Sequence, residues 1–303
     1  MIYKTILATI LLSVTAFTCS SQSNLEDVEK EMVALIKDFN GKAGFYVKDL
    51  RSGNAISYQP DTIFPTASMI KVPILVSVMD KVAEGELDYR QKFEYKDSLF
   101  YGGEDILNSF KDGEKIALDK LIMLMLTMSD NTASLWLQHI GGTGVRINEI
   151  MDELGLPNTR MNTRTPGRRP YWEKYGWGQT TPREMATLLE MIWKHEVIDA
   201  PTSERMLRNL KRNYWDGEAL SVLPPDVNTY SKNGAVSQSR SEVVLVNGRN
   251  SDYLFCIMTS DQVDDSWDYE NEGWELIRTL SKKLYNHFEP SDTTRISSDK
   301  RYH

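Results

Sequence analysis

The chain has 303 residues, of which 41% are hydrophobic, so it can bury a substantial core in one large domain or in two lobes that share a core. Its formal net charge is -8 at pH 7. Nucleic acids and anionic membranes attract positively charged surfaces, so neither is expected as a partner of this acidic chain. We also expect the protein to be a monomer.

The first residues have the pattern of an export signal. Lys4 supplies a positive charge, and residues 6–17 form an almost unbroken apolar run, shorter than the roughly 20 residues of a membrane-spanning helix. Cys19 follows at a junction that resembles a bacterial lipoprotein processing site. We therefore expect a signal peptide over residues 1–18, lipidation at Cys19 and a periplasmic, membrane-anchored protein. Ordinary cleavage or an uncleaved anchor are the alternatives, and both also place the protein outside the cytoplasm.

The cysteines and histidines do not suggest a metal site. If Cys19 is lipidated or removed, Cys256 has no disulfide partner, and its apolar, strand-like surroundings predict a buried core thiol. No cysteine or histidine pair has the spacing of zinc ligands. Neither a metal nor an organic cofactor is implied.

After the export signal, the pattern predicts one helix, two strands and then a series of helices. Hydrophobic periodicity predicts, in chain order, a helix over 25–40, strands over 43–50 and 55–58, and helices over 68–82, 116–128, 131–140 and 182–195. Several prolines and glycines interrupt residues 160–180, which predicts a long irregular loop of the kind that is usually functional.

The last third of the chain returns to strands. Alternating patterns predict strands over 227–232, 242–246 and 253–259, with Asn247-Gly248 as a hairpin turn. An amphipathic helix over 267–288 and a polar, disordered tail over 289–303 complete the chain.

This order of elements predicts an α/β fold with two lobes. Residues 25–65 and 210–288 would build one antiparallel sheet flanked by helices, and residues 66–209 would form an all-α lobe. The cleft between such lobes is a natural place for a ligand.

Ser68-Met-Ile-Lys71 is the first motif that carries chemistry. At i and i+3 of a helix, both side chains lie on one face. A lysine with a lowered pKa can remove the serine proton, and a helix start offers free N–H groups to a developing oxyanion. Ser68 is therefore a candidate nucleophile, although the motif alone is weak.

Two further motifs strengthen this interpretation. Ser129-Asp130-Asn131 lies between two predicted helices, where serine and aspartate also occur simply as helix caps. Lys232-Asn233-Gly234 lies at the end of a predicted strand, where the lysine could bind a substrate carboxylate and the glycine would allow close approach. The three motifs follow in order, 61 and then 103 positions apart.

Together these motifs resemble those of the class A β-lactamases and the wider penicillin-binding superfamily. The resemblance spans residues 25–288 and includes Thr180-Thr-Pro182 before a helix. It implies a β-lactamase-like fold with two lobes. It also implies that the protein hydrolyses β-lactams and so confers antibiotic resistance.

The resemblance also implies roles for single residues. Ser68 would be acylated, Lys71 would act as the general base or within a proton relay, and Ser129 would protonate the leaving nitrogen. The N–H groups of Ser68 and Ala235 would form the oxyanion hole. Asn131 would bind the acylamide side chain of the substrate, and Lys232, Asn233 and Arg240 its carboxylate. Gly234 would let the substrate backbone approach the edge of the strand. Arg240 also fits an ordinary exposed strand arginine.

The sequence departs from the family at the step that releases the acyl group. Class A enzymes carry a Glu-x-x-Leu-Asn segment in the loop before the Thr-Thr-Pro helix, but here Thr165 occupies the glutamate position and Arg169 the asparagine position. A threonine is no general base near neutral pH. Glu173 is the remaining acidic candidate between residues 162 and 182, although it also fits a solvated loop carboxylate.

Three functions follow from these residues. The first is a β-lactamase-type serine hydrolase with slow deacylation. The second is a peptidase or esterase of the same superfamily that acts on cell-wall peptides or other esters. The third is a non-catalytic, penicillin-binding-like protein.

Overall fold

The computed structural model describes residues 24–103, 105–211 and 213–292. The α-helices are α1 (Leu25–Lys37), α2 (Lys71–Ala83), α3 (Leu118–Thr127), α4 (Asn131–Ile140), α5 (Thr143–Glu153), α6 (Arg169–Tyr175), α7 (Pro182–Trp193), α8 (Ala200–Leu210) and α9 (Glu272–Phe288). The 3-10 helices are η1 (Ala67–Ile70), η2 (Asp97–Leu99), η3 (Ile106–Ser109) and η4 (Ala219–Val222). The strands are β1 (Lys42–Asp49), β2 (Ala55–Tyr58), β3 (Phe64–Pro65), β4 (Lys92–Glu94), β5 (Lys115–Ala117), β6 (Arg160–Met161), β7 (Gly178–Thr180), β8 (Asn228–Val236), β9 (Ser239–Asn247) and β10 (Asp252–Ser260).

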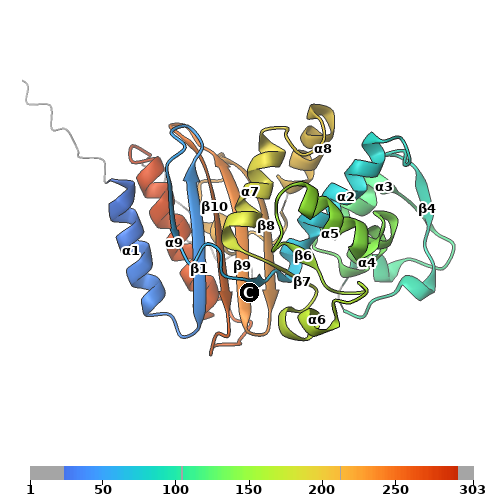
Figure 1. Ribbon diagram of the computed structural model, residues 1–303, viewed down its shortest axis with the longest axis horizontal. Helices are drawn as coiled ribbons and strands as arrows, with labels where there is room; N and C mark the ends of the chain where they lie inside the picture. The colour runs from blue at the N-terminus through green and yellow to red at the C-terminus, as the bar shows by residue number, and fades with distance from the viewer. Residues whose placement is uncertain (1–23, 104, 212, 293–303) are drawn as a thin grey trace, which may run out of the picture.

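Both ends of the chain contribute to one antiparallel sheet. Its strand order is β2-β1-β10-β9-β8, and β1 pairs with β10 from Lys42↔Ser260 to Asp49↔Tyr253. The pairing joins segments about two hundred residues apart, with the helices of the second lobe inserted between them (Figure 1). β8 is the edge strand and faces that lobe.

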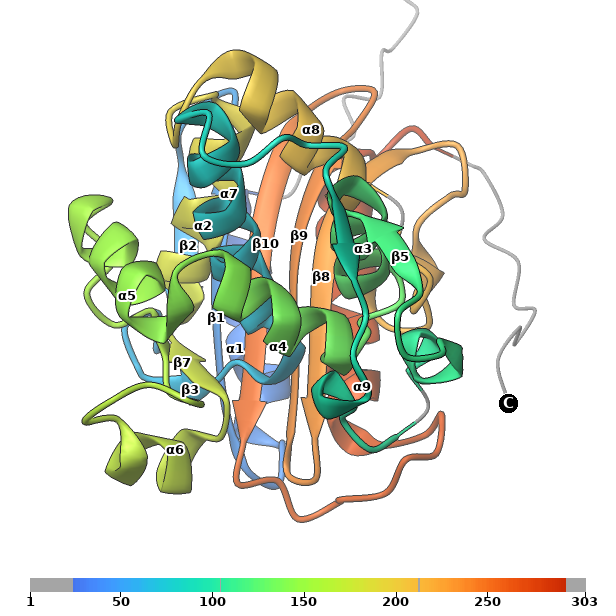
Figure 2. The ribbon, with the colours of Figure 1, turned by 90° about the vertical axis from the view of Figure 1, so that its right-hand side faces the viewer.

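Each face of the sheet is covered by helices because the strands are apolar on both sides. On β9, Val244 and Val246 belong to the core under α1 and α9, whereas Val243 and Leu245 belong to the core shared with the helical lobe. Figure 1 shows α1 and α9 on one side of the sheet, and Figure 2 shows α2, α4 and α7 on the other. The two lobes therefore share one hydrophobic core.

Side-chain caps fix the starts of the helices that border the site. Asp130 accepts a hydrogen bond from Ala133 N (2.7 Å) at the start of α4. Thr181 accepts one from Glu184 N (3.1 Å) at the start of α7, where Pro182 occupies the first turn.

The predicted two-lobed fold class is confirmed, with differences in its elements. Helices α5 and α8 were not predicted, and residues 115–117 form a strand rather than the start of a helix. The expected loop over 160–180 contains two short strands and α6. The last helix begins at Glu272, because Asn271 caps it by accepting hydrogen bonds from Gly273 N and Trp274 N.

The prediction of a disordered tail from residue 289 is wrong for its first residues. Glu289 is buried, and its carboxylate accepts hydrogen bonds from Asn250 N (2.8 Å) and Asn250 Nδ2 (2.7 Å). The rest of the predicted tail, the signal segment 1–18 and Cys19 lie outside the described residues.

Two further findings concern the described residues. Cys256 is fully buried on β10, as predicted, and burial raises the pKa of its thiol. Across the described part of the chain, no helix combines the length and apolar composition needed to cross a membrane.

Candidate active site

Ser68 lies on a tight turn between a short strand and a long helix. Thr66 N donates to Gly178 O (3.0 Å), and Met69 N donates back to Thr66 O (2.9 Å), so both sides of Ser68 are fixed. Ala67 has φ 43°, a left-handed conformation that is uncommon for alanine and typical of functional turns. The turn leaves Ser68 partly exposed while Lys71, one helical turn later, is buried.

Lys71 is the centre of the site. Its Nζ lies 3.0 Å from Ser68 Oγ, 3.0 Å from Ser129 Oγ and 2.9 Å from Asn131 Oδ1, and it also donates to Ser129 O. An ammonium has three protons to donate and a neutral amine has two, so one amine in contact with both hydroxyls can pass a proton between them.

Burial lowers the pKa of Lys71 well below the usual value for a lysine. The charge of Lys232 lowers it further, and the charges of Asp105 and Asp130 oppose the effect. A lowered pKa favours the neutral amine, which is the form that can act as a general base.

Ser129 is held between two helices in a conformation that few residues adopt. It follows the last turn of α3 and has φ 60°. Asp130 caps α4, as the structural interpretation of this motif predicted, and its second oxygen accepts a hydrogen bond from Leu107 N (3.0 Å). Asp105 was not predicted, but it accepts from Thr132 N (2.7 Å) and Thr132 Oγ1 (3.0 Å) and so supports the same turn.

The third motif approaches Ser68 from the edge strand β8. A Cβ added to Gly234 would lie 2.5 Å from Thr66 O and 2.8 Å from Ser68 N, so only glycine fits this contact. The next residue, Ala235, therefore follows directly beside the Ser68 backbone. The two N–H groups expected to form the oxyanion hole belong to neighbouring segments.

Lys232 is also fully buried, and burial lowers its pKa to about 8. Its Nζ donates to Asn233 O (2.9 Å) and Asn233 Oδ1 (3.0 Å). Since its charge acts on Lys71 and Gly234 touches the Ser68 turn, the three motifs converge on one site.

Arg240 is not part of this cluster, so the expectation that it binds a substrate carboxylate is corrected. It pairs with Ala235 in the β8–β9 register, on the opposite face of the strand from Lys232. Its guanidinium is buried, donates to Val236 O, Ser239 O and Ser266 O, and lies over two tryptophan rings, Trp267 and Trp274, at 4.7 and 4.5 Å. Arg240 therefore fixes the sheet edge to α9.

Glu173 is not brought to the site either. Residues 169–175 form the short helix α6, on which Glu173 pairs with Arg169 at 2.8 Å and its side chain is 58% exposed. Thr165 Oγ1 donates to Thr163 O (2.9 Å), and the Thr165 side chain packs directly against Gly144 of α5. Neither residue contacts Lys71, so the family position for the deacylation base holds no carboxylate here.

Three polar residues near Lys232 were not predicted from the sequence. Glu218 Oε2 accepts from Asn233 Nδ2 (3.2 Å), Asn213 Nδ2 lies 3.4 Å from Asn233 Oδ1, and Glu242 pairs with Asn233 in the β8–β9 register. Glu242 is a charged residue within an otherwise apolar predicted strand, and this pattern could have indicated a polar site on β9.

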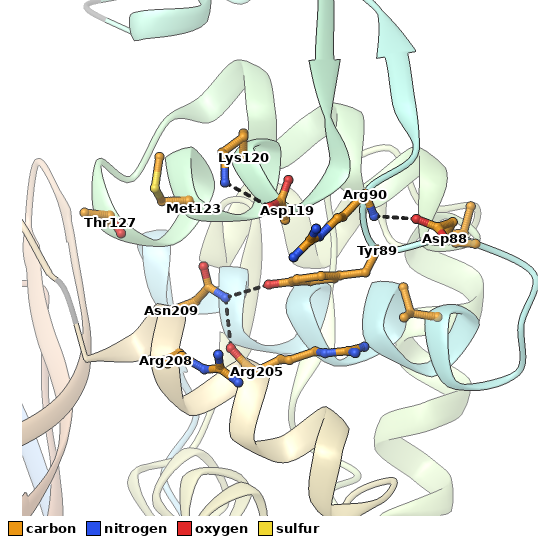
Figure 3. Close-up of a pocket in the computed structure, with 12 residues that line it drawn as sticks. Asp88, Tyr89, Arg90, Asp119, Lys120, Met123, Thr127, Arg205, Arg208 and Asn209 are labelled. Atoms are coloured by element: carbon orange, nitrogen blue, oxygen red, sulfur yellow. Dashed lines mark hydrogen bonds and ion pairs between the residues drawn. The ribbon is translucent and has the colours of Figure 1, made fainter.

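The described residues contain no cluster of three or more His, Cys, Asp or Glu side chains that could hold a metal ion. A cavity of about 510 Å³ lies beside α4 and includes Tyr101, Thr165 and Trp177 in its lining. A second cavity, of about 940 Å³, lies between α3, α8 and the segment 87–90 (Figure 3). Arg90, Arg205 and Asn209 surround Tyr89 there, and no predicted site residue lines it.

Comparison with known proteins agrees with this site. A family model described as "Beta-lactamase enzyme family" matches residues 27–288. Beta-lactamase BRO-1 of Moraxella catarrhalis is 24% identical over 279 residues, which cover 86% of this chain and 84% of that protein. The beta-lactamase regulatory protein BlaB of Streptomyces cacaoi is 30% identical over 112 residues, or 37% of this chain and 36% of that protein.

A solved structure gives the same result in three dimensions. PBP-A, determined as a single-residue variant in its acyl-enzyme complex with penicillin G, superposes with a TM-score of 0.78 at 27% sequence identity. The match covers 89% of this chain and 98% of that one.

Proposed function

Because the chain belongs to the beta-lactamase enzyme family, we propose that it is a serine hydrolase that opens β-lactam amides through a Ser68 acyl-enzyme and releases the acyl group slowly. The observation that carries the proposal is the position of Lys71 Nζ, buried and 3.0 Å from both the Ser68 and the Ser129 hydroxyl oxygens. A single-residue variant of PBP-A, which is similar to this chain, was determined as an acyl-enzyme complex with penicillin G.

The proposed acylation uses residues of this chain alone. The neutral amine of Lys71 takes the Ser68 hydroxyl proton while Ser68 Oγ bonds to the lactam carbonyl carbon. The Ser68 and Ala235 N–H groups stabilise the oxyanion. The C–N bond then breaks as the leaving nitrogen receives a proton from the Ser129 hydroxyl, which is replenished from Lys71.

Slow release follows from the residues beside the ester. Hydrolysis of the acyl-enzyme needs a base that activates water. Thr165 has no such group, and Glu173 is exposed and paired with Arg169. Lys71 is the remaining base in contact with Ser68, so acylation should be faster than release.

A chromogenic cephalosporin tests the proposal. We expect a burst of one equivalent of product per enzyme, followed by a slow steady state. Glu173→Gln should leave both phases unchanged, because this side chain does not reach the site. The absence of both burst and turnover, with a control β-lactamase active under the same conditions, would contradict the proposal.

The alternative within the same chemistry is a peptidase or esterase for cell-wall peptides. It uses the same acyl-enzyme, so only the relative rates separate the two. Faster acylation by D-Ala-D-Ala peptides than by β-lactams would favour the alternative.

A further inference from the structure

Two glutamates that the proposed mechanism does not use lie at the Lys232 end of the site. Glu218 Oε2 is 3.2 Å from Asn233 Nδ2, and Asn233 Oδ1 is 3.0 Å from Lys232 Nζ. Glu242 lies opposite Asn233 on β9 and is fully buried. The ammonium expected to receive a substrate carboxylate is therefore already beside two carboxyl groups of the protein.

Glu218 is held in place by the segment that follows it. Ala219 N donates to Glu242 Oε2 (2.8 Å), and Ser281 Oγ donates to Ala219 O (2.8 Å). These two bonds tie the start of η4 to β9 and to α9. Because both anchors lie on regular elements, Glu218 is not on a free loop that swings aside when a substrate binds.

The charges of Glu218 and Glu242 determine which substrate groups can bind beside Lys232. Burial raises the pKa of Glu218, while Asn233, Lys232 and Arg278 favour its charged form. Burial raises the pKa of Glu242 well above its usual value, and the charge of Glu218 adds to that effect. We assign the charged form to Glu218, which is partly exposed and accepts a hydrogen bond from Asn233, and the neutral form to the buried Glu242.

Two further cations, Arg240 and Arg278, lie close enough to act on Glu218. Arg278 donates to the backbone carbonyls of Gly217 (3.4 Å) and Tyr269 (2.5 Å). The charge of Glu218 acts on Arg240, but the Arg240 guanidinium donates to backbone carbonyls and lies over the rings of Trp267 and Trp274. Lys232 and Glu218 thus form a pair with almost no net charge. An anionic substrate end would meet the Glu218 carboxylate as well as the ammonium, and like charges brought together cost binding free energy.

We propose that Glu218 makes this end of the site prefer neutral acyl donors. Esters and amides without a negative charge beside the bond to be cleaved would react faster than donors that carry a carboxylate there. The inference rests on the proposed acyl-enzyme function and names its substrate class.

The test compares benzylpenicillin with its methyl ester. The acylation rate constants of both are measured, and their ratio cancels any dependence on Lys71, because both substrates use the same base. In the wild type, we expect the ratio of anion to ester to fall as the pH rises through the raised pKa of Glu218 and this side chain loses its proton, at pH values below the Lys232 pKa of about 8. In Glu218→Gln the ratio should be flat and about tenfold higher at neutral pH.

Glu275→Gln is the matched control, because it removes one negative charge from the exposed surface of α9. It should keep the wild-type ratio. A ratio that does not change with pH in the wild type would overturn the inference and needs no variant to fold. Equal ratios in the wild type and a folded Glu218→Gln protein would also overturn it. Acylation by neither substrate would instead overturn the proposed function and the inference with it.

Discussion

Two lysines in the site differ from ordinary lysines because both are removed from water. Neither Lys71 nor Lys232 has any solvent-exposed surface. Burial disfavours the charged form of each, and the charge of Lys232 disfavours that of Lys71. Lys232 therefore favours the neutral form of Lys71, in addition to any contact that it makes with a substrate.

Lys232→Met tests that role. Removing the charge of Lys232 raises the pKa of Lys71, so Lys71 becomes protonated at a higher pH and loses its function as a base there. The acid limb of the acylation pH profile, measured with a neutral ester, should move to higher pH. Lys174→Met, which changes an exposed lysine of α6, should leave the limb in place. An unmoved limb in Lys232→Met would show that Lys232 does not influence the base.

At the scale of elements, the site depends on how closely β8 approaches the turn before α2. Gly234 leaves no space for a side chain, since a Cβ there would meet Thr66 O and Ser68 N. The strand and the turn come from chain segments that pair with different partners, β9 and β7. Their contact therefore reports on the alignment of the sheet with the helical lobe.

Gly234→Ala should push the edge strand away from Ser68 and misalign the oxyanion N–H groups. We expect acylation to slow by about 10- to 100-fold, because overpacking of this kind costs about 1–3 kcal/mol. Gly102→Ala is the matched control, since nothing lies within 4 Å of a Cβ at that glycine. Acylation at the wild-type rate in a folded Gly234→Ala protein would contradict the assigned contact.

The sequence predicted the parts of this site that depend on local order. The spacing of Ser68 and Lys71 on one helix face, and the position of Ser129 between two helices, follow from periodicity and capping. The orientation of Arg240 depends on strand register, and the contact of Glu218 with Asn233 depends on how residues 213–227 fold back onto β8. Such long-range pairings leave no local pattern in the chain.

At the scale of the whole molecule, one hydrophobic core joins the sheet to the helical lobe. Leu245 and Cys256 from the sheet pack in the same cluster as Leu75 and Met125 from the helices. The site lies between the sheet and the helical lobe. Disrupting the shared core should therefore abolish both the alignment of these two parts and the activity.

Leu245→Ala should therefore destabilise both lobes at once, by about 2–5 kcal/mol, because it leaves a cavity in this shared core. Unfolding followed by tryptophan fluorescence and by far-UV circular dichroism should give coincident single transitions. Val263→Ala, at a side chain that is 78% exposed, should change stability by less than about 0.5 kcal/mol. Separate transitions for the two probes would indicate independent lobes.

The most direct test of the account is the intact mass of the protein during incubation with benzylpenicillin. The wild type should gain the mass of one benzylpenicillin molecule, on a peptide that contains Ser68, and keep it after the free antibiotic is removed. Ser68→Ala should gain nothing. An adduct on another residue, or an equal adduct on Ser68→Ala, would contradict the assignment of Ser68 as the nucleophile.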